Sequence, residues 1–181
     1  WAETDEGLVN LMKASTDANL EGRVMRYPRM DKEILAKYSK GIIASSGCPS
    51  GIIQTRLLLG QFDEALRAAG ELQDIFGRDN FYIEFMDHGL KIEKQVTDGL
   101  LDIAKKLNAP LLATNDSHYV RAEDAGSQDA MLCINSGSTL DEPGRFKFDG
   151  TGYYLKSAEE MRELFKDIPE ACDNTLEIRS E

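Results

Sequence analysis

"NFYIEFMDHGLKIEKQVTDGLLDIAKKLNAPLLAT", residues 80–114, is the stretch that decides the fold. Its first ten residues are aromatic and β-branched and predict a strand, and residues 109–114 form a second short apolar run. Between them, residues 91–108 carry apolar side chains at helical spacing and end in Asn108. Strand, helix and strand with short connections form a parallel βαβ unit. The stretch therefore predicts an α/β fold.

A second unit of the same kind precedes this stretch. Residues 41–46, "GIIASS", are short and apolar and predict a buried strand that ends in the turn-forming stretch "SGCPSG", residues 46–51. Residues 61–76 then place apolar side chains on one face of a helix, with Gly77 available to end it. The two units together predict parallel strands whose carboxyl ends meet at one edge of a sheet.

The flanking segments predict further helices. Residues 3–20 read as a helix capped by Thr4 or Asp5, and residues 30–40 as a helix capped by Asp31. The apolar residues at helical spacing in the first helix are Leu8, Leu11 and Met12. Toward the carboxyl terminus the sequence predicts helical turns over residues 121–134, a loop over 135–144 and two short strands over 145–157. A helix over 158–166 with a Ser157–Glu160 capping box and a last helix over 169–178 follow.

The composition predicts one soluble domain without a membrane span. The chain has 181 residues, 41% of them hydrophobic and 29% charged, and no apolar run reaches the length that a transmembrane helix needs. A net charge of −11 without a Lys/Arg cluster argues against tight DNA binding by this chain alone. Three widely spaced cysteines fit a reducing cytoplasm better than a disulfide framework. The start at Trp1, without an initiator Met, predicts a piece of a longer protein.

Metal-compatible side chains follow each of the three predicted strands. Cys48 follows the first strand, Glu84 and His88 lie at the end of the second, and Asp116 and His118 follow the third. Ligands of parallel α/β folds gather beyond the carboxyl ends of the strands, so these groups are expected near one another. Side chains two residues apart in an extended segment point the same way, which favours a shared cation for the Asp-x-His pair.

Carboxylate and imidazole together suit zinc, manganese or iron, and a thiolate from Cys48 would favour zinc. Such a metal lowers the pKa of bound water and polarises a phosphoryl oxygen, which predicts phosphoester hydrolysis.

Each residue also has a structural interpretation. The Asp-x-His pair can be a polar strand end, Cys48 a small buried hydrophobe, and Asp87 to Gly89 a turn, while Glu84 can point to either face.

Four motifs follow one another along the chain: "SSGCPSG" (45–51), "YIEFMDHGL" (82–90), "ATNDSHYV" (113–120) and "FKFDGTGYYLKSAEEM" (146–161). In this order they resemble the PHP (polymerase and histidinol phosphatase) domain of the bacterial replicative DNA polymerase III α subunit, in its actinobacterial type. The resemblance implies part of a distorted (β/α)7 TIM-like barrel whose first strands are missing. Residues 1–145 would be the carboxyl-terminal portion of the PHP domain, and residues 146–181 its end and the join toward the polymerase core.

The resemblance also implies a metal site at the carboxyl ends of the barrel strands, holding zinc or manganese. By that resemblance Cys48, Asp116 and His118 would be ligands, whereas Glu84 and His88 match positions to which no ligand role is carried over. The family's opening H-x-H, its T-D-H segment, a glutamate and a histidine before Trp1 would precede this chain, and the polymerase carboxylates would follow it. We therefore expect the fragment itself to be inactive and to hold an incomplete metal site.

Two functions follow from the resemblance. In the first, the parent is a DNA-directed DNA polymerase, a nucleotidyltransferase of DNA replication, whose PHP domain is a metal-dependent 3′–5′ exonuclease or phosphoesterase. In the second, the PHP domain is a non-catalytic scaffold that supports the polymerase core and binds the proofreading subunit. A free-standing phosphatase of the histidinol-phosphatase type is a third option, against which "YYLKSAEEM" (153–161) argues because it resembles the join to the polymerase core.

The expected partners are the rest of the α subunit, DNA in the parent protein, and proofreading and clamp subunits. An interrupted barrel would expose the edge of its first remaining strand. We therefore also expect the fragment to associate with a second copy through that edge.

Overall fold

A three-stranded parallel sheet forms the centre of the molecule. The computed structural model describes residues 1–180. The strands lie in the order β3-β4-β5 and comprise Ala44–Ser45, Phe81–Phe85 and Leu111–Ala113. Phe85 lies beside Ala113, so β4 and β5 end side by side, while β3 ends at Ser45 beside Tyr82, three residues before the end of β4. All three carboxyl ends point to the same edge of the sheet. We call this edge the carboxyl edge.

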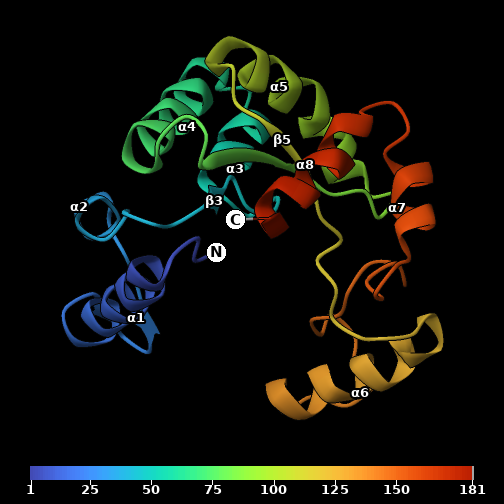
Figure 1. Cartoon of the computed structure of the whole chain (residues 1–181). Helices are drawn as coiled ribbons and strands as arrows, with labels where there is room; N and C mark the ends of the chain where they lie inside the picture. Colours follow the sequence, from blue (N-terminus) through green and yellow to red (C-terminus); the bar gives the residue numbers. More distant parts are fainter. Residues whose placement is uncertain (181) are drawn as a thin grey trace.

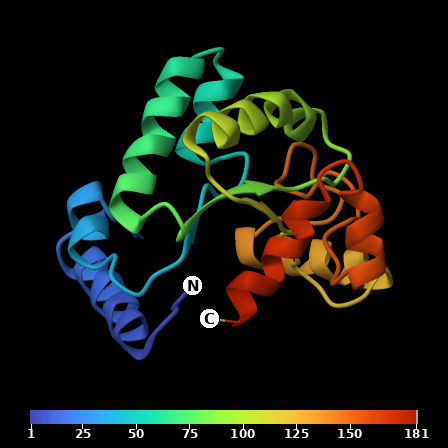
Figure 2. The same ribbon diagram turned by 45° about the horizontal axis from the view of Figure 1, so that its top comes forward.

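Three helices cover one face of the sheet. They are α3 (Ile52–Leu58), α4 (Phe62–Phe76) and α5 (Lys91–Leu107), and Figures 1 and 2 show them on the same side of the strands. Alternate residues of β4, Phe81, Ile83 and Phe85, face these helices and pack with Ile53 and Ile103 in the main core. The aromatic and β-branched pattern of this strand therefore supplies the sheet side of the core.

The opposite face is smaller and is covered in part by the last helix. Ile43, Tyr82 and Leu112 form a second cluster there, against which Ile178 packs. This residue belongs to α8 (Pro169–Ser180), whose Asn174 Nδ2 donates a hydrogen bond of 2.7 Å to the carbonyl oxygen of Leu111. The helix thus satisfies a backbone acceptor of the edge strand β5, which would otherwise be open.

The predicted βαβ unit is confirmed. The helix expected over residues 91–108 is α5, and Asn108 follows it in the left-handed conformation, with φ 50° and ψ 43°. Asparagine tolerates this conformation better than most residues, which ends the helix and turns the chain toward β5. The helix expected over residues 61–76 is also confirmed as α4, whereas α3 was not predicted.

The amino-terminal segment forms two helices and a small hairpin. Helix α1 (Asp5–Leu20) is capped by Thr4, whose Oγ1 accepts from the amide of Gly7, and α2 (Lys32–Lys37) is capped by Asp31. The pair β1 (Arg23–Val24) and β2 (Tyr27–Pro28) was not predicted. The apolar residues at helical spacing in α1 lie exposed: Leu8, Leu11 and Met12.

Helix α1 packs through small residues. Gly7, Ala14 and Ala18 are its buried residues. A Cβ at Gly7 would lie only 1.7 Å from the carbonyl oxygen of Gly41, so no larger residue fits without moving the backbone. This close approach explains why the stripe of larger side chains faces away.

The edge expected to be open is partly covered by the chain itself. Trp1 exchanges two hydrogen bonds with Ile43, of 2.6 and 2.9 Å, and Ala2 forms an antiparallel bridge with Ile42. The backbone preceding β3 is therefore already paired. Association with a second copy through this edge stays a prediction.

The carboxyl-terminal segment contains short helices but not the two strands expected over residues 145–157. The helices are η1 (Ala122–Asp124), α6 (Ala125–Ser136) and α7 (Ala158–Leu164). In place of the strands there is a single parallel bridge between Tyr119 and Tyr154. The strands within residues 1–180 form no closed barrel, so the α/β class is confirmed and the (β/α)7 barrel stays a prediction. No helix in that range is long and apolar enough to cross a membrane.

Candidate metal centre

Asp116 and His118 lie next to each other just beyond the carboxyl edge. The Oδ1 atom of Asp116 is 3.3 Å from the Nε2 atom of His118, and their side chains are 43% and 37% exposed. The sequence predicted this proximity from an extended backbone. The reason in the structure is different, because Asp116 adopts a left-handed conformation with φ 44°, which aspartate tolerates better than most residues. The pair is open to solvent and presents an oxygen and a nitrogen donor on one side.

The loop of residues 115–118, which we call the NDSH loop, is held by the segment of residues 152–156. The amide of His118 donates to the carbonyl oxygen of Tyr153 at 2.8 Å. The side-chain amide of Asn115 donates to the carbonyl oxygens of Gly152 and Tyr154, at 3.1 and 2.7 Å. Backbone and side-chain bonds from two positions therefore fix the loop on both sides of Asp116.

Lys156 completes this contact from the other side. Its amine donates to Oδ1 of Asn115 at 2.8 Å and also to the carbonyl oxygen of Gly152. Burial lowers the pKa of the Lys156 amine below its ordinary value, against the nearby charge of Glu160. The lysine thus orients the amide group of Asn115, whose oxygen faces the amine and whose nitrogen faces the two carbonyls.

His88 is buried and uses both ring nitrogens inside the fold. Its Nδ1 lies 2.6 Å from Oε1 of Glu93, and its Nε2 lies 2.9 Å from the carbonyl oxygen of Asn115. The side chains of His88 and Glu93 are only 1% and 5% exposed. The ring also stacks on Tyr153, with centroids 4.1 Å apart. The turn expected at residues 87–89 is present as well, because the amide of Gly89 donates to Oδ1 of Asp87.

Glu84 joins the three strands to one another. The hydroxyl groups of Ser45 and Thr114 donate to its two carboxylate oxygens, each at 2.5 Å. These contacts place Glu84 on the same face as Tyr82 and Leu112, which answers the question of its direction. Glu84 is 8% exposed, and its carboxylate accepts hydrogen bonds from the segments of both neighbouring strands.

Cys48 lies in an exposed turn beyond β3. The interpretation of Cys48 as a small buried hydrophobe is wrong, because its thiol is free and the residue is exposed. The turn is fixed by a bond from the amide of Gly51 to the carbonyl oxygen of Cys48 and by one from Gln54 Nε2 to the carbonyl oxygen of Gly47. Among residues 1–180, no three His, Cys, Asp or Glu side chains come together as a metal-holding group, so Cys48 does not join the Asp-x-His pair.

The donor chemistry of this pair fits a divalent cation, although two donors alone do not complete a site. A carboxylate and an imidazole are ligands that zinc and manganese accept, and a neutral imidazole can coordinate through Nε2. The exposure of both side chains leaves room for further ligands. Asp116 and His118 can therefore form one side of a metal centre, while Cys48 would have to approach from the β3 turn.

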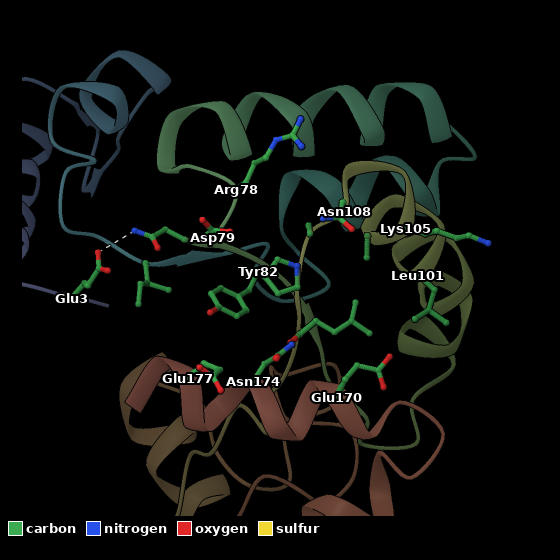
Figure 3. Close-up of a pocket in the computed structure, with 16 residues that line it drawn as sticks. Glu3, Arg78, Asp79, Tyr82, Leu101, Lys105, Asn108, Glu170, Asn174 and Glu177 are labelled. Atoms are coloured by element: carbon green, nitrogen blue, oxygen red, sulfur yellow. Dashed lines mark hydrogen bonds between the residues drawn. The ribbon is translucent and has the colours of Figure 1, made fainter. Parts of the chain in front are cut away.

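A cleft lies at the opposite end of the strands from the Asp-x-His pair. It has a volume of about 1030 Å³, and Figure 3 shows Tyr82, Asn174 and Glu177 among the residues that line it. Asn80 and Pro110, which precede β4 and β5, also line it. The cleft therefore belongs to the amino ends of the strands and does not include the Asp-x-His pair. Its charged lining residues carry both signs: Glu3, Arg78, Asp79, Lys105, Glu170 and Glu177.

Comparison with known proteins agrees with the motifs. The family described as "PHP domain" matches residues 1–88. A DNA polymerase III subunit alpha of Saccharopolyspora erythraea is 58% identical over 178 residues, and one of Mycobacterium tuberculosis is 54% identical over the same length. The protein of that name from Borreliella burgdorferi is 41% identical. Each match covers 98% of this chain. Over nearly its whole length the chain is therefore similar to one segment of DNA polymerase III alpha subunits.

The identity is higher for the two actinobacterial relatives than for the spirochaetal one, so the expected actinobacterial type is confirmed. The chain spans about 15% of the length of these polymerase subunits. The PHP match ends at His88, whereas the similarity to the polymerase subunits continues over 98% of the chain. The boundary predicted near residue 145 stays a prediction.

Sequence reasoning missed the residues that hold the NDSH loop. Asn115, Glu93, Tyr153 and Lys156 were not predicted to belong to the site. One of them had a local signal: Glu93 is the third residue of α5, a position from which glutamate reaches back to amides before the helix. Its Oε2 indeed accepts from the amides of His88 and Leu90, at 2.7 and 3.2 Å.

Proposed function

We propose that this segment supplies Asp116, His118 and Cys48 to a divalent metal site in a PHP domain of a replicative polymerase subunit. The complete site, holding zinc or manganese, acts as a 3′–5′ exonuclease or phosphoesterase on DNA. The observation that carries the proposal is the 3.3 Å approach of the Asp116 carboxylate to the His118 imidazole in a solvent-open position beyond the carboxyl edge. This edge is where α/β folds bind ligands.

The chain's own residues would have defined tasks in this chemistry. A bound metal lowers the pKa of water and polarises a phosphoryl oxygen. Asp116 and His118 supply an oxygen and a nitrogen donor, and Asn115 and Lys156 hold the loop that carries them. The chain carries a net charge of −11. Attraction of DNA would therefore come from other parts of the polymerase, since acidic surfaces repel phosphates.

The isolated chain is expected to be inactive, because the structure brings together two donors and not three. The remaining ligands would come from the polymerase sequence around this segment. We also propose that the polymerase core, DNA, and the proofreading and clamp subunits are partners of the complete protein, and that it works in the cytoplasm. The similarity to DNA polymerase III subunit alpha supports these proposals.

The test uses the polymerase subunit that carries this segment. Metal-stripped protein is supplied with Mn²⁺ or Zn²⁺, and release of nucleotides from a 3′-labelled single strand is measured. Asp116→Asn and His118→Ala should lose most of the metal-dependent release, while Asp167→Asn, an exposed carboxylate between α7 and α8, should keep it. Full nuclease activity in both site variants would refute the proposal.

The second candidate is a scaffold without catalysis, and the engagement of Glu84 and His88 favours it. Both lie at strand ends, and both are held by internal bonds that connect strands and loops. On this view the side chains at the carboxyl edge hold the strands and loops together and bind no catalytic metal. Polymerase activity and subunit binding would then fall in Glu84 and His88 variants, while protein stripped of metal and assayed with Mg²⁺ would keep its full polymerase activity.

A further inference from the structure

A buried chain of polar groups runs from α5 to the NDSH loop. It begins at Glu93 in the first turn of α5, passes through the ring of His88 and ends at the carbonyl oxygen of Asn115. Asn115 is the residue directly before Asp116. We propose that the Glu93–His88 pair is a positioning device that sets the conformation of the Asp116–His118 pair for metal binding. This inference rests on the proposed metal site.

The hydrogen-bond pattern fixes what His88 offers to the NDSH loop. Its Nε2 faces the carbonyl oxygen of Asn115, which can only accept, so Nε2 carries a hydrogen and donates it. Nδ1 and Oε1 of Glu93 share the second hydrogen bond of the ring. The other oxygen of Glu93 accepts from the amides of His88 and Leu90. Both side chains are therefore buried with their hydrogen bonds satisfied.

The Glu93–His88 pair holds the peptide group between Asn115 and Asp116, and a small rotation of this group would change the direction of the Asp116 carboxylate. The carbonyl of Asn115 belongs to the peptide group whose nitrogen is that of Asp116, and Asp116 has a φ of 44°. A donor fixed at 2.9 Å from this oxygen resists rotation of that peptide plane. Release of the contact would let Asp116 return toward ordinary negative φ, where its carboxylate would point elsewhere.

The ring of His88 also connects to His118 through aromatic contacts. His88 stacks on Tyr153 at 4.1 Å, Tyr153 stacks on Phe148 at 4.8 Å, and Phe148 packs against the ring of His118 at 4.6 Å. The carbonyl of Tyr153 accepts from the amide of His118. Both donors of the Asp-x-His pair thus rest on residues that touch His88.

Partners of this kind are common around metal ligands. Groups that orient a ligand without touching the metal typically change metal affinity by about 10–100-fold when they are removed. His88 would be such a group, since it acts on the backbone between β5 and Asp116. A merely structural role would lower stability without a selective effect on metal binding.

Two substitutions of His88 separate these roles. Glutamine places an amide N–H near the position of Nε2 and can keep the contact to Asn115, whereas asparagine places one near Nδ1 and can keep the contact to Glu93. Both variants lose the ring. Only His88→Asn loses the donor to the NDSH loop.

The experiment measures binding of Mn²⁺ to the complete polymerase subunit, by the electron paramagnetic resonance signal of free Mn²⁺. His88→Asn should raise the dissociation constant about tenfold, and His88→Gln should stay within about threefold of the wild type. Hydrogen exchange of the amides of residues 115–119 in the metal-free protein should be faster in His88→Asn than in His88→Gln. Asn174→Ala is the matched control, because it removes a donor to a carbonyl at the other end of β5.

Equal affinity in His88→Asn and the wild type would overturn the inference, and so would equal losses in both His88 variants. His118→Ala separates this failure from failure of the proposed function. If His118→Ala binds Mn²⁺ as tightly as the wild type, the metal site itself is wrong and the inference falls with it. If His118→Ala loses Mn²⁺ while His88→Asn keeps it, only the positioning role is wrong.

Discussion

His88 and His118 each follow a strand that ends at the carboxyl edge, and each has an aspartate within two residues before it. Their environments are opposite. The His88 side chain is 1% exposed and both of its nitrogens face acceptors of the fold, whereas the His118 side chain is 37% exposed and its Nε2 faces Asp116. Position at a strand end therefore does not decide whether a histidine is free to bind a ligand. The side chains that reach the ring decide it.

The difference begins with the element that follows each histidine. Helix α5 starts three residues after His88 and brings Glu93 back over the turn. After His118 the chain continues into a short 3₁₀ helix, and the nearest ring is that of Phe148. Glu93, in the first turn of a helix, thus binds the ring of His88, whereas the ring of His118 stays partly exposed to solvent. The comparison shows that His88 is part of the fold, whereas His118 stays open to a ligand.

The largest expected effect comes from His88→Ala. This change leaves the Glu93 carboxylate buried without its partner, which typically costs about 3–5 kcal/mol. Urea unfolding of the chain, followed by far-ultraviolet circular dichroism, would measure the loss. A loss below about 1 kcal/mol would mean that water replaces the ring easily. The contrast between the two histidines would then disappear.

Glu93→Gln is expected to have an intermediate effect. The amide oxygen of glutamine can still accept at one end, but its NH₂ group cannot accept, so a contact to His88 or Leu90 is lost. A loss of about 1–3 kcal/mol follows, as for a buried polar group left without its hydrogen bond. The same urea titration checks it. Lys91→Gln, in the exposed first turn of the same helix, is the control and should change stability by less than about 0.5 kcal/mol.

Much of the fold could be predicted because its signals are local. The strand and helix periods within residues 80–114 gave β4, α5 and β5, and Asp31 and Ser157 marked helix starts correctly. Helix α3 was missed because Gly51, at its start, offers no side-chain cap. The strands β1 and β2 have two residues each, which is too short for a visible alternation.

The site could be predicted only in part for a related reason. The Asp-x-His spacing is local and predicted that Asp116 lies beside His118, but not the left-handed backbone of Asp116 that brings them together. The burial of the His88 ring depends on its contacts with Asn115 and Tyr153, which are distant in the sequence, and no periodicity reveals such contacts. The expected convergence of Cys48 depends in the same way on how the β3 turn lies relative to the NDSH loop.

The smallest expected effect on stability comes from His118→Ala, and this variant gives the most direct test. Its exposed side chain should contribute less than about 0.5 kcal/mol to folding. Metal bound per polymerase subunit, after Mn²⁺ loading and removal of the excess, is measured by mass spectrometry for the wild type and the variant. The account predicts that His118→Ala unfolds at the wild-type urea concentration and retains substantially less metal. Undiminished metal content, or a large loss of stability, would contradict it.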